Sequence, residues 1–234
     1  MSACLVGSEM CIRDRSNQEW AAFIAAINAM HGIGVPAPAY RDFVRVHVDA
    51  MSPIGMPWGV HTMAGMGMVG RNFLAWHRRF LWQLEQRLQA INPSVTVPYW
   101  DWIADRALPA AINDPALLQS WGVTRTWDAS LLPISHDLTA VTARTTFASF
   151  QRTLEQVHNN VHGAVGGTMD SSSSPADPVF WLHHGNLDRI WARWQTQHPT
   201  AAPHNPAEVL QPPPLFGVAV SSVLSIATLG YSYA

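Results

Sequence analysis

The sequence is poor in cysteine and in charged residues. Its two cysteines, Cys4 and Cys11, lie near the start of the 234-residue chain, so the remainder can build neither a disulfide framework nor a thiolate metal site. Charged residues make up 13%, the formal net charge is -2 and no basic run occurs, which excludes the electrostatic signature of a nucleic-acid-binding protein. No run of about 18 apolar residues occurs, so no membrane-spanning helix is predicted. With 48% hydrophobic residues, we expect a folded, soluble protein with a small, uncharged partner.

The first 15 residues look unlike the rest of the chain. The string LVGSEMCIRDR, from Leu5 to Arg15, is the translation of a transposase-type sequencing adapter. We therefore interpret residues 1–15 as a disordered sequencing artefact and expect residues 16–234 to form one domain. The segment also lacks the positive region and the unbroken apolar region of a signal peptide, which leaves the compartment open between the cytoplasm and export with a partner.

Apolar residues at helical spacing predict a mainly α-helical fold with long irregular loops and little β-structure. Ser16 and Glu19 form a capping box, and Asn72 and Asp177 are typical residues at helix starts. We expect helices over about residues 16–31, 38–51, 72–92, 143–162 and 177–197, irregular structure over 93–140, and a wrapping tail with one short strand in the last 30 or so residues. The apolar faces of four of these helices include histidines: His47, His77, His158 with His162, and His184.

The spacing of the histidines indicates a metal site. The strongest single signal among the 11 histidines is His158-Asn-Asn-Val-His162, because residues at i and i+4 on a helix bring two imidazoles close enough to share one ion. Zinc proteases need a glutamate after the first histidine as general base, and Asn159 in that position cannot accept a proton. The inward Glu-x-x-His pairs of a di-iron carboxylate bundle are also missing from the sequence. An all-imidazole site suits copper, zinc, iron or nickel.

Four segments of the chain carry a specific pattern around these histidines. They are Phe73-Leu-Ala-Trp-His-Arg-Arg-Phe80, Pro98-Tyr-Trp-Asp-Trp102, His158-Asn-Asn-Val-His162-Gly and Asp177-Pro-Val-Phe-Trp-Leu-His-His-Gly-Asn-Leu-Asp-Arg-Ile-Trp191. Together they resemble the copper A and copper B signatures of the tyrosinase family, which includes catechol oxidases and molluscan hemocyanins. The similarity runs in order from about Tyr40 to Trp194. It implies a four-helix bundle that encloses two copper ions, CuA and CuB, each with three histidine ligands, and that binds dioxygen as co-substrate.

The resemblance assigns the ligands residue by residue. It implies His47 and His77 for copper A, and His158, His162 and His184 for copper B. In most relatives the remaining copper A ligand lies nine residues before the histidine of the Trp-His-Arg motif, where this chain has Met68. We favour the nearby His61 for this position over a Met68 thioether, which would favour Cu(I) and weaken oxygen binding.

Five further residues receive roles from the resemblance. Phe180 is expected to pack against the His184 ring, His183 to lie just outside the direct ligands, and Asp188 to orient a ligand histidine or cap a neighbour. Glu155 and Asn159 match positions that hold a water, which takes the proton of a monophenol with a solution pKa of about 10. That pair favours tyrosinase over pure catechol oxidase activity. The alternative is that Glu155 makes only an ordinary surface pair.

The function implied by the resemblance is the oxidation of monophenols, o-diphenols or both to o-quinones with dioxygen. The alternatives are a catechol oxidase without monophenolase activity, a hemocyanin-like oxygen carrier, and a degenerate relative that binds zinc or one copper. Carriers are usually large proteins with a domain covering the coppers, whereas this sequence ends shortly after its core, so we favour an enzyme. Short bacterial-type relatives sometimes work with a small copper-chaperone, or caddie-type, protein, which is one candidate partner besides the phenol.

Overall fold

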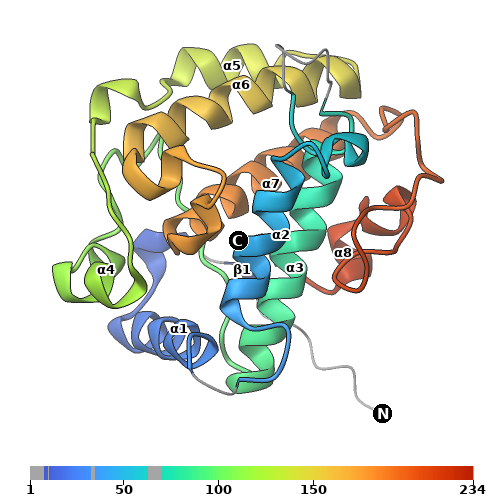
Figure 1. Ribbon diagram of the computed structural model, residues 1–234. Coiled ribbons are helices and arrows are strands. Elements are labelled where there is room, and N and C mark those ends of the chain that lie inside the picture. Colours follow the sequence, from blue (N-terminus) through green and yellow to red (C-terminus); the bar gives the residue numbers. More distant parts are fainter. Residues whose placement is uncertain (1–7, 10, 33–34, 63–69, 234) are drawn as a thin grey trace.

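The computed structural model describes residues 8–9, 11–32, 35–62 and 70–233, and it confirms that the chain is mainly helical (Figure 1). The helices are α1 Asn17–Met30, α2 Tyr40–Ala50, α3 Phe73–Ile91, α4 Pro115–Trp121, α5 Ser135–Thr142, α6 Phe147–Val165, α7 Val179–Gln197 and α8 Ile226–Leu229. The strands β1 Ser8–Glu9 and β2 Ser232–Tyr233 form a parallel pair. None of the helices in these ranges is both long enough and apolar enough to cross a membrane.

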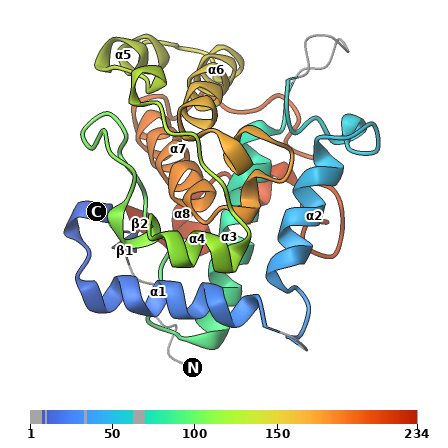
Figure 2. The same ribbon diagram turned by 60° about the vertical axis from the view of Figure 1, so that its left-hand side comes forward.

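Helices α2, α3, α6 and α7 form the four-helix bundle, and α7 is its most buried member. Every residue of α7 from Val179 to Trp191 is buried, although this stretch includes charged side chains. A buried charge is costly unless it is paired, and Asp188 pairs with Arg78 of α3 while Arg189 pairs with Asp101. In both views α5 and α6 lie on the side of the molecule opposite α1 (Figure 2).

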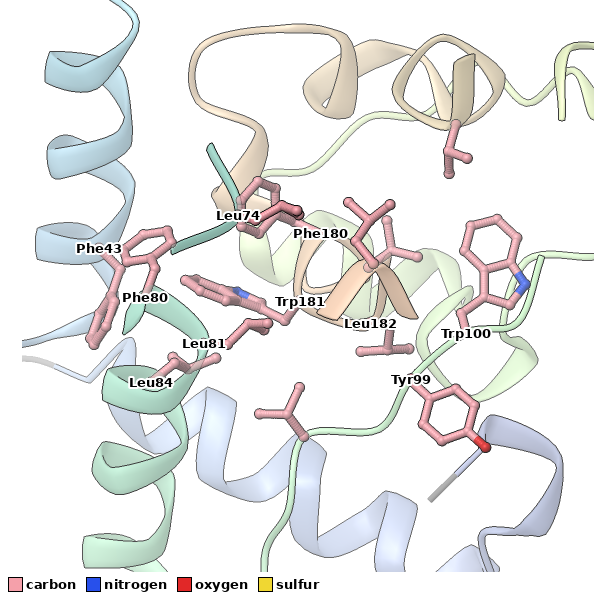
Figure 3. Packing of buried hydrophobic residues seen from close by; sticks show 14 of the residues in the cluster. Phe43, Leu74, Phe80, Leu81, Leu84, Tyr99, Trp100, Phe180, Trp181 and Leu182 are labelled. Carbon is pink, nitrogen blue, oxygen red and sulfur yellow. The ribbon is translucent and has the colours of Figure 1, made fainter. Parts of the chain in front are cut away.

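Aromatic side chains fill the space between α7, α2 and α3. The Trp181 ring of α7 lies with its centroid 5.8 Å from that of Phe43 on α2 and 4.7 Å from that of Phe80 on α3 (Figure 3). Its indole Nε1 donates a hydrogen bond to the Tyr40 hydroxyl at 2.9 Å, so the polar atom of this fully buried ring is satisfied. Burying one phenylalanine side chain stabilises a fold by about 1.5–3 kcal/mol. The packing of these rings therefore fixes α2, α3 and α7, which all carry histidines, relative to one another.

The helix bounds agree with the expected ones to within a few residues, with two exceptions. α6 begins at Phe147 rather than near residue 143, because the Thr146 side chain caps it there. Residues 93–140, which we expected to be irregular, contain α4 and α5. Asp114 and Pro115 are a good cap and first position for α4, but a helix of seven residues is too short to show a periodic apolar face. β2 is the short strand expected in the tail.

Residues 8–9 and 11–15 differ from the disorder that we expected for the first 15 residues. β1 pairs with β2, and Cys11 is buried with 8% of its surface exposed. Arg15 donates a hydrogen bond to the Thr96 carbonyl at 2.7 Å. A segment that offers apolar and hydrogen-bonding groups can pack against a fold whatever its origin. These contacts therefore do not test where the segment came from, and the sequencing-artefact interpretation stays a prediction.

Candidate metal centre

Seven histidines converge inside the bundle. α2 carries His47, α3 carries His77, α6 carries His158 and His162, α7 carries His183 and His184, and His61 lies in the segment before α3. They form two groups, His47 with His61 and His77, and His158 with His162, His183 and His184. Within each group, one potential ligand atom per residue lies within 4.8 Å of the others. The structure therefore brings together all six histidines that the sequence proposes as copper ligands.

The two histidine groups lie side by side. The His77 ring is stacked on the His184 ring with centroids 4.2 Å apart, and the centroids of His61 and His158 are 5.9 Å apart. Each group is therefore a candidate site for one ion, and the two ions would be neighbours.

The orientation of the imidazoles suits metal binding through Nε2. The Nδ1 atoms of His47, His77 and His162 lie 2.8, 2.8 and 2.6 Å from the carbonyl oxygens of Ser172, Phe73 and Met169. A carbonyl only accepts hydrogen bonds, so each Nδ1 carries the proton and each Nε2 presents a lone pair. These three Nε2 atoms, and those of His61 and His158, are buried without a hydrogen-bond partner among the described residues. Buried polar atoms are normally satisfied, and a bound metal ion would satisfy all of these.

Burial also keeps these imidazoles neutral. It lowers the pKa of His47 to about 4, and it lowers the pKa values of His61, His77, His158 and His184 well below their usual range. The neighbouring histidines add to the effect, because a second positive charge close by is unfavourable. Only a neutral imidazole can bind a metal ion, so the folded chain holds its ligands in the form that binding requires.

His183 and His184 are adjacent in sequence but differ in their hydrogen bonds. Trp102 Nε1 lies 3.2 Å from His183 Nδ1, and an indole can only donate, so the neutral His183 ring carries its proton on Nε2. That tautomer has no lone pair left on Nε2 for a metal. Both ring nitrogens of His184 are without a partner in the described structure. This contrast supports the expectation that His184 is the ligand and that His183 lies just outside the ligand set.

The structure places His61 with the other two copper A candidates. Its ring centroid lies 5.2 Å from that of His47 and 5.0 Å from that of His77. Met68, the alternative ligand, lies outside the described residues. The geometry therefore supports His61.

The contacts of Phe180 and Asp188 differ in how well they agree with expectation. The Phe180 ring packs on His184 with centroids 4.1 Å apart, as expected. The Asp188 carboxylate accepts hydrogen bonds from Arg78, Tyr231 and Tyr233, and none of these partners is a histidine. Its charge pairs with a buried arginine, and the expectation that Asp188 orients a ligand histidine or caps a neighbour stays a prediction.

Glu155 and Asn159 are one turn apart on α6, but their side chains have different surroundings. Both oxygens of the Glu155 carboxylate accept hydrogen bonds from Thr62, and Glu155 is buried with 4% of its surface exposed, so it is not an ordinary surface residue. Asn159 is exposed, and its Oδ1 lies 3.0 Å from His158 Nδ1.

One cavity adjoins the histidines of the site, and a separate one lies at Glu155 and Thr62. The first, a cleft of about 370 Å³, opens onto these histidines and is lined by His47, Met51, His61, His158, Asn159, His162, Met169, Asp170, Ser171, Ser172 and Ser174. The other, of about 200 Å³, is lined by Glu155 together with Thr62, Gly70, Gln151 and neighbouring residues. The structure therefore does not bring Glu155 and Asn159 onto one cavity among the described residues.

Sequence reasoning missed several residues that position the site. The carbonyls of Ser172 and Met169 come from the segment between α6 and α7, and a backbone carbonyl carries no signal in the sequence. Trp102 lies in the Pro98-Tyr-Trp-Asp-Trp102 motif, which marked it without revealing its contact with His183. Thr62 had one available signal, its place directly after a proposed ligand.

Comparison with known proteins gives one consistent result. The common central domain of tyrosinase matches residues 37–128 and 111–197. The tyrosinase of Streptomyces galbus is 34% identical over 230 residues, covering 76% of this chain and 79% of that protein. The tyrosinase of Streptomyces antibioticus is 34% identical over 176 residues, covering 56% of this chain, and the matched part of the chain spans 64% of that protein's length. A solved structure of deoxygenated hemocyanin from Rapana thomasiana superposes with a TM-score of 0.78 and 22% identity, covering 99% of this chain and 70% of that one.

Proposed function

The chain belongs to the tyrosinase family, and from this premise we propose that it oxidises phenols to o-quinones with dioxygen at two copper ions. One observation carries the proposal: two adjacent groups of buried, neutral histidines point unpaired ring nitrogens at one another beside an open cleft. In the overall reaction, two o-diphenols and one dioxygen give two o-quinones and two waters.

The protein's part is to hold the metal ions and admit the substrate. His47, His61 and His77 would bind one copper, and His158, His162 and His184 the other. When bound, the coppers supply dioxygen binding and electron transfer between the phenol and dioxygen. The carbonyls of Ser172, Phe73 and Met169 fix the ring orientation and tautomer of three of these ligands before any metal arrives.

The cleft suits a single aromatic ring. Its volume of about 370 Å³ lies in the range of small-molecule sites, and its lining combines thioethers of Met51 and Met169 with polar groups of Asn159 and Ser171. A phenol that enters here reaches His47, His61, His158 and His162 directly. The ring can contact apolar atoms while its hydroxyl faces the histidines.

Monophenol hydroxylation is the finer part of the proposal, and it depends on a group that takes the phenol proton. Asn159 and Glu155 match the family positions that hold a water, and we propose Asn159 for this task, because Glu155 lines the other cavity. Asn159 lines the cleft and can orient such a water, although an amide cannot itself accept the proton.

The proposal is tested by copper content and oxygen uptake. The protein is stripped with a chelator and reloaded from a copper salt; copper per chain and oxygen uptake are then measured with catechol and with L-tyrosine. Two coppers and uptake with both substrates would support the whole proposal, and uptake with catechol alone would restrict it to catechol oxidase activity. Reversible oxygen binding without substrate oxidation, or zinc or a single copper with no uptake, would overturn it. Uptake of two coppers from the salt alone would show that loading needs no caddie-type partner.

A pair of histidine variants supplies the control. His77→Ala should lose copper and activity, because it removes a ring that faces both groups. His136→Ala changes an exposed histidine of α5 outside both groups and should keep two coppers and full activity.

A further inference from the structure

Thr62 joins the segment that carries His61 to helix α6. Its backbone N donates a hydrogen bond to Glu155 Oε1 at 2.6 Å, and its hydroxyl donates one to Glu155 Oε2 at 2.6 Å. Hydrogen bonds to a carboxylate are roughly twice as strong as those between neutral groups. Thr62 follows His61 directly, so these two bonds fix the backbone next to the imidazole.

The Thr62 hydroxyl also accepts a hydrogen bond. Gly70 N donates a hydrogen bond to the Thr62 hydroxyl at 2.9 Å, so the two described residues that flank 63–69 are joined. Gln151, one turn before Glu155 on α6, donates from its side-chain amide to the Gly70 carbonyl at 2.8 Å. Helix α6 thus holds both ends of this segment with the side chains of Glu155 and Gln151.

We propose that Glu155 and Thr62 are positioning residues for His61, and that this clamp places the irregular copper A ligand against His47 and His77. The identity of the metal rests on the proposed function, whereas the placement of the ring does not. The clamp explains how a histidine seven positions from the usual ligand position can still complete the group. The carboxylate also lies 3.9 Å from His61 Nδ1, where its negative charge favours a metal-bound ring.

The clamp is a different use of Glu155 from holding a water for a monophenol. Both carboxylate oxygens are already engaged by Thr62, and the carboxylate lines the cavity away from the cleft that Asn159 lines. A group that positions a ligand should affect copper binding and every substrate alike. A water-holding group should affect monophenols alone.

The test compares Thr62→Val with Thr62→Ser, with Thr153→Val as matched control. Valine keeps the shape of threonine but removes the hydroxyl that links Glu155 to Gly70, and serine restores it. Within the described ranges the Thr153 hydroxyl, on α6, bonds only to the carbonyl of Ser149 in its own helix, so its replacement leaves the clamp intact. Copper affinity is measured by competition with a chelator, and circular dichroism of the metal-free variants checks that each one folds.

We expect Thr62→Val to bind one of the two coppers with a 10- to 100-fold weaker affinity, so that this copper is lost to the competing chelator. A change of that size is usual when a group that supports a metal ligand is removed. Thr62→Ser should recover most of the affinity, and Thr153→Val should bind like the unchanged protein. Oxidation of catechol and of L-tyrosine should fall in Thr62→Val by the same factor.

Two outcomes would overturn the clamp. The first is a folded Thr62→Val that retains both coppers with unchanged affinity. The second is a Glu155→Gln variant that binds both coppers normally but loses only L-tyrosine oxidation, which would instead support the water-holding role. Failure of the proposed function would look different. The unchanged protein would oxidise no phenol, but Thr62→Val would still lose one copper, and the clamp would stand.

Discussion

Replacing Asp188 with asparagine would remove the negative charge that pairs with a fully buried arginine. Arg78 lies on α3 next to His77, and its side chain has 0% exposure against 3% for Asp188. The Arg78 Nε donates to one oxygen of Asp188, and the hydroxyls of Tyr231 and Tyr233 donate to the other at 2.7 and 2.6 Å. The carboxylate therefore connects α3, α7 and the C-terminal segment at one point.

The cost of this substitution follows from the burial of both partners. Removing one member of a buried ion pair costs about 3–5 kcal/mol, because the remaining charge is left uncompensated. Arg78 keeps hydrogen bonds to the Leu224 carbonyl at 2.7 Å and to the Gln195 side chain at 3.1 Å, so we expect the lower end of that range. For a chain of this size, about 3 kcal/mol corresponds to a fall in Tm of about 6–12 °C.

The assay is urea unfolding of the copper-free protein, with Glu208→Gln as the control. Glu208 pairs with Arg71, whose side chain is 47% exposed, and it also accepts hydrogen bonds from Asn72 and Asn205. Because glutamine keeps one acceptor oxygen, we expect this control to lose about 1 kcal/mol. An Asp188→Asn variant that is as stable as the control would refute the reasoning. If the variant were stable but lost its copper B ion, the result would support the role that the sequence suggested for Asp188, the orientation of a ligand histidine.

Four further predictions concern the site. His184→Ala should lose one copper, whereas His183→Ala should keep two, because only His184 has both ring nitrogens without a partner in the described structure; metal analysis of the two variants checks this. Phe180→Ala should destabilise the protein by about 3–5 kcal/mol in urea unfolding and loosen copper binding, since it opens a cavity against the His184 ring. Gly70→Ala should weaken one copper as Thr62→Val does, because a Cβ there would lie 2.9 Å from Thr62 N and 3.0 Å from both Glu155 oxygens. The copper-free protein should lose stability as the pH falls from 6.5 toward 4, because burial lowers the pKa of His47 from 6.5 to about 4 and the unfolded chain therefore binds this proton first. The neutral His47 contributes about 3 kcal/mol to the free energy of unfolding, fully present only above pH 6.5, and unfolding at several pH values measures it.

The helices that carry the site were predictable because each is long and has a periodic apolar face. Asn72 marks the start of α3, and Ser16 with Glu19 forms the capping box of α1, as expected. The short helices α4 and α5 escaped prediction because seven or eight residues span only about two turns, too few for a period to show. Local caps alone do not say whether a helix or a turn follows.

The proposed ligands can be divided in the same way into those on helices and one in a loop. His158 and His162 follow from helical geometry, since an i, i+4 spacing fixes the two rings on one face. His61 does not follow from spacing, because a loop has no period and its path depends on the contacts of its ends. Those contacts run from Thr62 and Gly70 to side chains of α6 that are 93 and 81 positions away in sequence. Sequence distance of this kind hides the clamp from any local pattern.

The means by which the histidines are oriented determine where mutation can change the site. His47, His77 and His162 are held by backbone carbonyls, which no side-chain substitution removes. His61 instead depends on the side chains of Thr62 and Glu155, each of which a single substitution can abolish. Because a ligand held by side chains can be adjusted without moving a helix, substitutions at Thr62 or Glu155 should change the affinity for copper A. In the copper B group the corresponding point is the Asn159 side chain, whose Oδ1 lies 3.0 Å from His158 Nδ1, so a single substitution there should change the affinity for copper B.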